Sequence, residues 1–203
     1  MALPTRLLDL SSLPSQHDII HCEKDPHEIF CTKSFKLIET TASQGCYVAL
    51  SYCWGKNIPY TTTSKNVEKH QGKGISYEEI PKTLQEAVLV TRLLGLQYLW
   101  IDSLCIIQDD QKDWEHEAAR MGLVYSRAYI TIAASRAHHC GEGFLQPRST
   151  YEETRKMPFT DNNGSFELQF QYDDLQSSPS PIVPETDHPL RLHMASRPVN
   201  LIP

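Results

Sequence analysis

Residues 98–135 constrain the fold more than any other part of the chain. This segment contains an apolar run, YLWI, then polar residues from Asp102, a long stretch with helical spacing, and a second apolar run, AYITIAA. Short apolar runs without charge are typical of strands buried on both faces of a parallel sheet. The segment therefore predicts a strand–helix–strand unit, whose parallel strands are joined by a right-handed crossover.

A similar unit precedes it. Residues 47–52 (YVALSY) form a compact apolar run, and residues 81–94 have helical spacing, with Thr83 as a candidate N-cap and Gly95 just after the end. The helix leads into the predicted strand at residues 98–101. Two successive units predict an α/β fold with a mostly parallel, doubly wound sheet of the flavodoxin-like kind.

The flanking regions predict β additions to this core. Residues 5–10 and 35–40 are short runs that read as strands, and DNNG at 161–164 is a turn signal before alternating apolar residues, as in a hairpin. Polar residues 56–80 predict a long loop or lid. We expect three parts: an N-terminal extension (1–44), a core domain (45–148) and a C-terminal hairpin with a loose tail rich in Ser and Pro (149–203).

Composition excludes several functions. The 203-residue chain has a net charge of −6, which offers no electrostatic case for nucleic-acid binding. It lacks an apolar run of ~18 residues for a membrane span and an apolar leader at its N-terminus, so we expect a cytoplasmic protein. The six cysteines form no CxxC pair, and there is no GxGxxG, P-loop or HExxH motif. We therefore expect no bound metal and no cofactor.

Ligands of parallel sheets bind beyond the carboxyl ends of the strands. The polar residues predicted to converge there are Ser51, Tyr52, Trp54, Asp102, Ser103, Cys105, Gln108 and Glu117. The position of Asp102 at the end of a predicted strand favours a functional role, although strand-end aspartates also cap loop amides. Trp54 and Trp114 either stack on a flat ligand or fill the core. Cys105 and His116 could form a nucleophile–base pair, but the apolar neighbours of Cys105 favour a packed thiol.

The phase of the second helix separates two glutamates. An apolar stripe is predicted from Trp114, Ala118, Met121 and Tyr125, with Asp109 or Asp110 as the helix cap. Glu117 borders this stripe, whereas Glu115 points roughly 160° away from Glu117 at ~100° per residue. Helix phase therefore favours Glu117 as the residue that faces a cleft with Asp102. The alternative is that Glu117 is a solvated helix glutamate.

Three blocks in this order resemble the fungal heterokaryon-incompatibility (HET) domain over about residues 45–148: YVALSYCWG, the helix from IPKTLQEAV onward, and residues 98–135. The resemblance implies a fungal protein and a death-inducing effector in non-self recognition. In that family the core is usually followed by a Pro-Leu…Arg-x-Trp…Gln-Glu block. Here His188-Pro189-Leu190-Arg191 begins similarly and then differs, which implies a truncated or altered end.

HET domains are remotely similar to Toll/interleukin receptor (TIR) domains, many of which cleave NAD at the nicotinamide–ribose bond. YVALSYCWG is similar to the first TIR strand, and DWEHE to the TIR segment in which Trp precedes a catalytic glutamate by about four residues. Here Glu117 follows Trp114 by three. The resemblance implies that NAD is a substrate, that Glu117 contacts its ribose, that Trp54 or Tyr52 covers a ring, and that Asp102 and Ser103 position hydroxyls or phosphates.

Two other functions stay open. The chain could be a non-enzymatic signalling module that self-associates, or a modulator that binds full-length HET relatives. We therefore expect its partners to be copies of itself or other HET or sensor proteins. The pairing of Glu117 with Trp114 near the strand ends favours an enzyme, and the lack of a nucleotide-binding motif favours a module.

Overall fold

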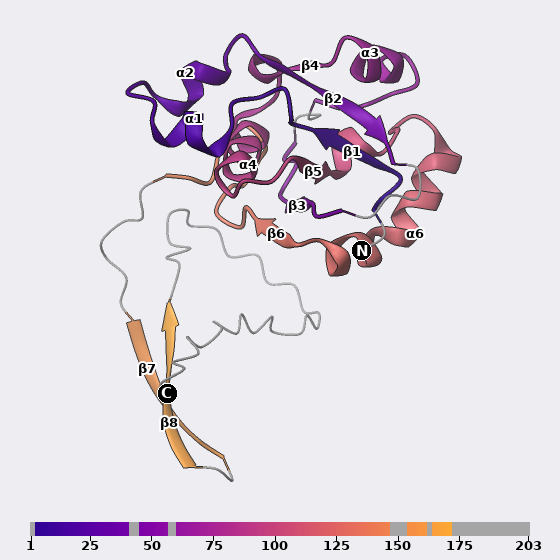
Figure 1. Cartoon of the computed structure of the whole chain (residues 1–203). Helices are drawn as coiled ribbons and strands as arrows, with labels where there is room; N and C mark the ends of the chain where they lie inside the picture. Colours follow the sequence, from indigo (N-terminus) through magenta and orange to yellow (C-terminus); the bar gives the residue numbers. More distant parts are fainter. Residues whose placement is uncertain (1–2, 41–44, 57–59, 147–153, 162–163, 172–203) are drawn as a thin grey trace. The chain divides into compact units, whose positions relative to one another are not determined.

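A computed structural model describes residues 3–40, 45–56, 60–146, 154–161 and 164–171 (Figure 1). The chain divides into two compact units, Met1–Pro147 and Arg148–Pro203. The described part of the first unit contains a six-stranded sheet with helices, and that of the second contains a two-stranded hairpin.

The six-stranded sheet is open and has the strand order β4–β2–β1–β5–β3–β6. Its strands are β1 (Arg6–Asp9), β2 (Ser34–Glu39), β3 (Val48–Ser51), β4 (Ile75–Ser76), β5 (Tyr98–Ile101) and β6 (Ile130–Ala133). β3 pairs in parallel with both β5 and β6, so that Leu50 lies opposite Ile101 on one side and Ile132 on the other. These three strands confirm the two predicted strand–helix–strand units.

The sheet is mixed, which corrects the prediction of a mostly parallel, doubly wound sheet. β1 pairs antiparallel with β2 and with β5, and β2 pairs antiparallel with β4. Antiparallel pairing needs no long crossover helix, and the β1–β2 connection contains only two short helices. β1 therefore occupies the free edge of β5, where a further parallel strand would otherwise add. Both predicted N-terminal strands are present, and they belong to the same sheet as the core.

Two long helices make the parallel crossovers, α4 (Lys82–Leu93) and α6 (Gln111–Arg127). Because β5 and β6 flank β3 on opposite sides, right-handed crossovers place α4 and α6 on opposite faces of the sheet (Figure 1). On the α6 face, Trp100 packs edge-to-face against Tyr125, with ring centroids 5.5 Å apart. The Tyr125 hydroxyl also donates to the Leu50 carbonyl (3.3 Å), which joins the helix to the central strand.

The N-terminus of α4 differs from the prediction. Pro81, with φ of −59°, is the N-cap, and Thr83 lies within the first turn. Proline fits there because its fixed φ suits a helix start and its missing N–H would be unpaired anyway. The Thr83 hydroxyl instead accepts from the Gly143 amide (3.1 Å), so it holds the loop after β6. Gly95 follows the helix with φ of 73°, as predicted.

The segments predicted as loops contain short elements. Between β1 and β2 lie α1 (Gln16–Ile20) and α2 (Pro26–Phe30), and residues 56–80 include α3 (Val67–Gly72), β4 and a 3-10 turn, η1 (Tyr77–Glu79). A further single-turn helix, α5 (Asp102–Cys105), follows β5. None exceeds six residues, which is too short for hydrophobic periodicity to reveal.

The second unit contains β7 (Thr154–Asp161) and β8 (Gly164–Gln171), paired antiparallel with Asp161 opposite Gly164. This pairing agrees with the predicted hairpin, and residues 162–163 at its centre lie outside the described residues. The predicted loose tail, including His188–Arg191, lies outside the described residues. Within the part of the chain that the structure describes, no helix has the length and apolar character that a membrane crossing requires.

Candidate functional site

Asp102 lies where β5 ends and α5 begins, and both of its carboxylate oxygens have donors. Oδ1 accepts from the Ser103 amide (2.6 Å), and Oδ2 accepts from the indole Nε1 of Trp54 (3.1 Å). Trp54 follows β3, which is the parallel neighbour of β5, so the adjacent strand ends bring the two residues together. Asp102 thus performs the capping role that strand-end aspartates often have, and it also fixes an indole ring.

Three more predicted residues join this group. The Tyr52 hydroxyl donates to Ser103 Oγ (2.8 Å), and the Gln108 side-chain amide donates to the Asp102 carbonyl (3.0 Å). Tyr52, Trp54, Asp102, Ser103 and Gln108 are therefore joined by hydrogen bonds, and we call them the Asp102 group. Ser51 is the last residue of β3 and is exposed.

Burial dominates the electrostatics of the Asp102 group. Desolvation raises the pKa of Asp102, although the hydrogen bonds from Ser103 and Trp54 act in the opposite direction. Burial, with the nearby charge of Asp102, also raises the pKa of Tyr125 to about 12 and that of Tyr52 above its ordinary value. Both phenols therefore stay protonated at neutral pH and remain available as donors.

Thr62, which the sequence analysis did not single out, connects residues 60–70 to the Asp102 group. Its amide donates to the Ser103 carbonyl (2.9 Å), its carbonyl accepts from the Gln108 amide (2.8 Å), and its hydroxyl donates to the Leu104 carbonyl (2.7 Å). His70 Nδ1 lies 3.0 Å from the same hydroxyl and donates to it, since the hydroxyl proton is already used. The predicted lid is thus fastened to the strand ends at this residue.

Glu117 lies in a second group, which we call the Arg6 group. Its residue exposure is 2%, and its Oε1 is buried with no hydrogen-bond partner among the described residues. Arg6 of β1 is ion-paired with Asp113 and donates to the Cys105 carbonyl (2.8 Å). Burial lowers the pKa of Arg6, but Asp113, Glu117 and Cys105 together raise it above its ordinary value. Glu117 is therefore a buried carboxylate near a cation that is already engaged.

The predicted stripe of α6 is confirmed in part, because Ala118, Met121 and Tyr125 are half-buried and the last two pack against the core. Trp114 is 50% exposed, whereas Glu117 and Val124 are buried. The inward line runs through Asp113, Glu117 and Val124, so Glu117 lies in it and Trp114 falls outside. The prediction of a buried Trp114 is wrong, and so is the alternative of a solvated Glu117. Asp110 is the helix cap, one of the two residues predicted.

Glu115 lies on the outer side of α6. It is exposed, and Oε1 accepts from the Gln111 side chain (2.8 Å). Among the described residues, no hydrogen bond connects Glu117 to the Asp102 group. The structure therefore gathers five of the predicted site residues at the strand ends and places Glu117 beside Arg6, a partner that the sequence analysis did not identify.

Cys105 and His116 do not form a nucleophile–base pair. Cys105 is buried, and desolvation raises its pKa to about 12, so it is a packed thiol. The His116 side chain is 61% exposed, and its Nε2 accepts from Arg120 (3.1 Å). Across the described ranges, no three His, Cys, Asp or Glu side chains gather as they would around a metal ion.

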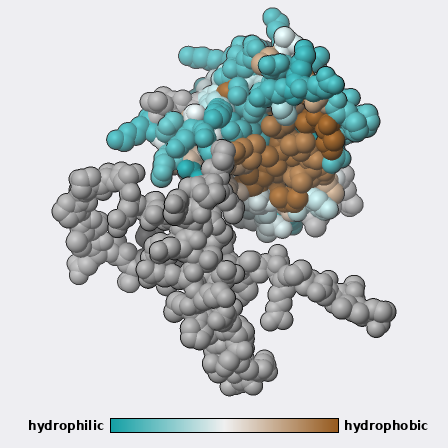
Figure 2. All heavy atoms as spheres, turned by 90° about the vertical axis from the view of Figure 1, so that its left-hand side faces the viewer, coloured by the Kyte–Doolittle hydropathy of each residue, from teal (hydrophilic) through white to brown (hydrophobic). Residues whose placement is uncertain are grey.

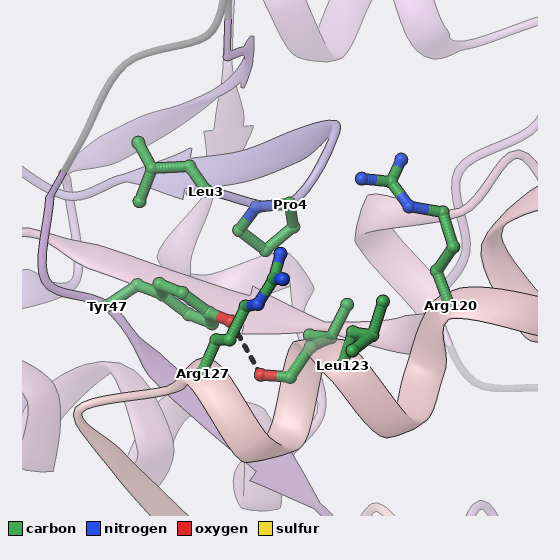
Figure 3. Close-up of a pocket in the computed structure, with 7 residues that line it drawn as sticks. Leu3, Pro4, Tyr47, Arg120, Leu123 and Arg127 are labelled. Carbon is green, nitrogen blue, oxygen red and sulfur yellow. Dashed lines mark hydrogen bonds between the residues drawn. The ribbon is translucent and has the colours of Figure 1, made fainter. Parts of the chain in front are cut away.

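A small pocket lies away from both groups, between the N-terminal segment and the second half of α6 (Figure 3). Its walls are Leu3, Pro4, Tyr47, Arg120, Leu123, Val124 and Arg127. None of the predicted site residues lines it.

A family model described as "Heterokaryon incompatibility protein (HET)" matches residues 47–197, which is more than half of the chain. The match begins just before β3 and includes both parallel crossovers, the Asp102 group and Glu117. Searches of curated proteins and of solved structures found no match. The chain therefore belongs to the heterokaryon incompatibility (HET) family, and this membership implies a role in heterokaryon incompatibility in fungi.

Proposed function

We propose that this HET protein is a cytoplasmic effector that triggers cell death by cleaving NAD at the nicotinamide–ribose bond, with Glu117 as the catalytic carboxylate. The observation that supports this most is the Oε1 atom of Glu117, which is buried and has no donor. Buried polar atoms in native proteins nearly always have partners, and functional sites are a common exception. A substrate hydroxyl would supply the missing hydrogen bond.

The chemistry needs only a positioned carboxylate and water. Glu117 accepts a hydrogen bond from a ribose hydroxyl and stabilises the positive charge that develops on the ribose as the bond to nicotinamide breaks. Water then adds to the ribose carbon and loses a proton, which gives ADP-ribose and nicotinamide. Arg6 stays paired with Asp113, and His116 Nε2 lies 3.9 Å from Glu117 Oε1, beyond hydrogen-bond distance, so Oε1 can still accept a hydrogen bond from the ligand.

The Asp102 group would hold the rest of the ligand. Asp102 fixes the indole of Trp54, which can cover a flat ring. The further substrate-binding residues in this proposal are Ser51, Tyr52, Ser103, Gln108 and Trp114. Since Glu117 is 2% exposed, the ribose reaches it only after the side chains above it move. Substrate entry is therefore coupled to a local opening between β1 and α6.

The test is nicotinamide release from NAD by purified protein, with Glu117→Gln compared with Glu115→Gln. The two changes are chemically identical and lie on the same helix, but only Glu117 is buried. We expect release to fall at least about 100-fold with Glu117→Gln, as for loss of a main electrostatic group, and to persist with Glu115→Gln. No turnover by the wild-type protein, even when it is concentrated, would reject the enzymatic proposal.

A signalling module that works by self-association is the second candidate. Figure 2 shows a continuous apolar area on the side that carries α4 in Figure 1, and Leu94 at the end of this helix is 44% exposed. Large exposed apolar areas commonly mark interaction sites. Sedimentation of wild-type and Leu94→Asp protein tests this candidate. It is favoured if the wild type assembles, Leu94→Asp stays monomeric, and Glu117→Gln still triggers death in cells.

A further inference from the structure

Residues 60–73, which we call the strap, are fastened at two places to the segment that follows β5. The inner anchor is Thr62, with the three hydrogen bonds described above. The outer anchor is Ser64, whose amide and hydroxyl donate to the two carboxylate oxygens of Asp109 (2.6 and 2.7 Å). Because Thr62 bonds to two members of the Asp102 group, the inner anchor holds the strap against that group.

A buried histidine completes the inner anchor. His70 lies on α3, within the strap, and its residue exposure is 1%. Its Nδ1 lies 3.0 Å from Thr62 Oγ1 and donates to it, because that hydroxyl already donates to the Leu104 carbonyl. The imidazole also stacks on the Tyr60 ring, with centroids 5.6 Å apart. The first residues of the strap are therefore joined to α3 through this imidazole.

The surroundings of His70 disfavour its protonated form. Burial lowers the pKa of His70 below the ordinary 6.5, and the charge of Lys69 acts in the same direction. The charge of Glu79 acts in the opposite direction, but this half-exposed carboxylate lies 3.9 Å from Lys69 Nζ and accepts from the Tyr60 hydroxyl (2.9 Å). Burial raises the pKa of Tyr60 to about 12, so the stacked ring stays neutral. His70 is therefore neutral in the anchored strap and binds a proton more readily once it reaches water.

We propose that His70 makes the inner anchor a pH-sensitive latch: once protonated, the imidazolium moves into water, the Thr62 anchor is lost, and the strap opens beside the Asp102 group. The pKa of His70 is lower in the closed strap than in water, so the anchor is complete above pH 6.5 and is lost as the pH falls through the lowered value. The outer anchor persists, because the hydrogen bonds from Ser64 hold the pKa of Asp109 below the ordinary 3.8. The latch thus couples access to the Asp102 group to a fall in pH, and it does not depend on NAD cleavage.

The test measures hydrogen exchange of single amides by NMR at a series of pH values, with each rate divided by its intrinsic rate. The Thr62 amide donates to the Ser103 carbonyl (2.9 Å), and the Gln108 amide donates to the Thr62 carbonyl (2.8 Å), so both report the inner anchor. We expect both amides to exchange through a local opening, with protection at least about tenfold below that of the Leu10 amide, which donates to Gln97 at a distant part of the sheet. Below pH 6.5, protection at Thr62 and Gln108 should fall about tenfold per pH unit, as the release of one anchor by one proton requires.

His70→Gln separates this titration from others. The glutamine amide can still donate to Thr62 Oγ1 but does not titrate, so the fall in protection below pH 6.5 should disappear. His21→Gln, at an exposed histidine after α1, is the matched control and should keep it. Asp102 also titrates, but burial raises its pKa, so its protonation favours the closed strap and acts in the opposite direction.

The imidazole NMR signal of His70 in the wild-type protein is a second measurement that needs no variant. This signal should titrate below pH 6.5, together with the loss of protection at Thr62. The proposal is overturned if the ring titrates at pH 6.5 or above, or if His70→Gln keeps the full pH dependence. It is also overturned if Thr62 is as protected as Leu10 at every pH, because the strap would then open only when the whole protein unfolds.

Discussion

Asp102 and Glu117 are both acidic residues near the buried Cys105, and after burial itself the charges of both raise the pKa of its thiol. Their hydrogen bonding differs. Each oxygen of Asp102 has a donor, from Ser103 and Trp54, whereas Oε1 of Glu117 has none among the described residues. A fully satisfied carboxylate stabilises the local fold, and an unsatisfied buried one costs stability. The difference supports a structural role for Asp102, and it is the basis of our proposal that Glu117 is kept for a ligand.

The largest expected effect comes from Arg6→Met. This change removes the cation from Asp113 and Glu117 together, and it leaves one partly buried and one buried carboxylate without that cation. We expect the free energy of unfolding in urea to fall by about 3 kcal/mol, the lower end for a broken buried pair because Asp113 is partly exposed. Adding Glu117→Gln to Arg6→Met should recover part of the loss. No recovery would show that Arg6 does not interact with Glu117.

A smaller effect is expected from Trp54→Phe. The ring is kept, but Asp102 Oδ2 loses its indole donor. The free energy of unfolding should fall by about 1 kcal/mol, the usual cost of one lost hydrogen bond. Trp114→Phe is the matched control, because Trp114 is half-exposed, and it should change stability by less than about 0.5 kcal/mol. Equal losses in the two variants would contradict the structural role given to Asp102.

The smallest expected effect is a pH dependence due to Asp102. Burial raises the pKa of this carboxyl in the folded protein above the ordinary 3.8, so the folded state binds the proton more tightly than the unfolded state. The resulting stabilisation is complete below pH 3.8 and is lost as the pH rises through the folded-state pKa. As the pH rises from 3.8 through the folded-state pKa, the free energy of unfolding of the wild type should therefore fall relative to that of Asp102→Asn. An unchanged difference would contradict the raised pKa.

The parts of the fold that follow from local pattern could be predicted from the sequence. The strands β3, β5 and β6 appear as short apolar runs, and Gly95 and Asp110 have the residue types that helix ends require. The mixed sheet could not be predicted, because no local signal shows that β1 inserts between β2 and β5. Strand order depends on packing between distant segments, which periodicity does not report.

The same limit applies to the candidate site. The Asp102 group could be predicted in outline, since its members lie at the ends of adjacent parallel strands. The surroundings of Glu117 could not be predicted, because Glu117 lies on α6 and Arg6 lies far away in the sequence, on β1. Trp114 was wrongly predicted to be buried, because the +4, +3, +4 spacing from Trp114 to Tyr125 fits a helical stripe as well as the spacing of the residues that do face inward. Only the packing of α6 on β1 and β5 decides between them.

The most direct test of the contrast between the two carboxylates compares the unfolding free energies of Glu117→Gln and Asp102→Asn at neutral pH. Both changes replace a carboxylate with an amide of the same shape. In Asp102→Asn, the side-chain NH2 group replaces the oxygen that accepts from the indole N–H of Trp54, so two donors face each other. We therefore expect the free energy of unfolding to fall by about 1–2 kcal/mol. Glu117→Gln removes a buried charge whose Oε1 had no donor to lose, so we expect a change within about 0.5 kcal/mol of wild type. A loss from Glu117→Gln as large as that from Asp102→Asn would show that Glu117 is a structural residue and would contradict its role as a carboxylate kept for a ligand.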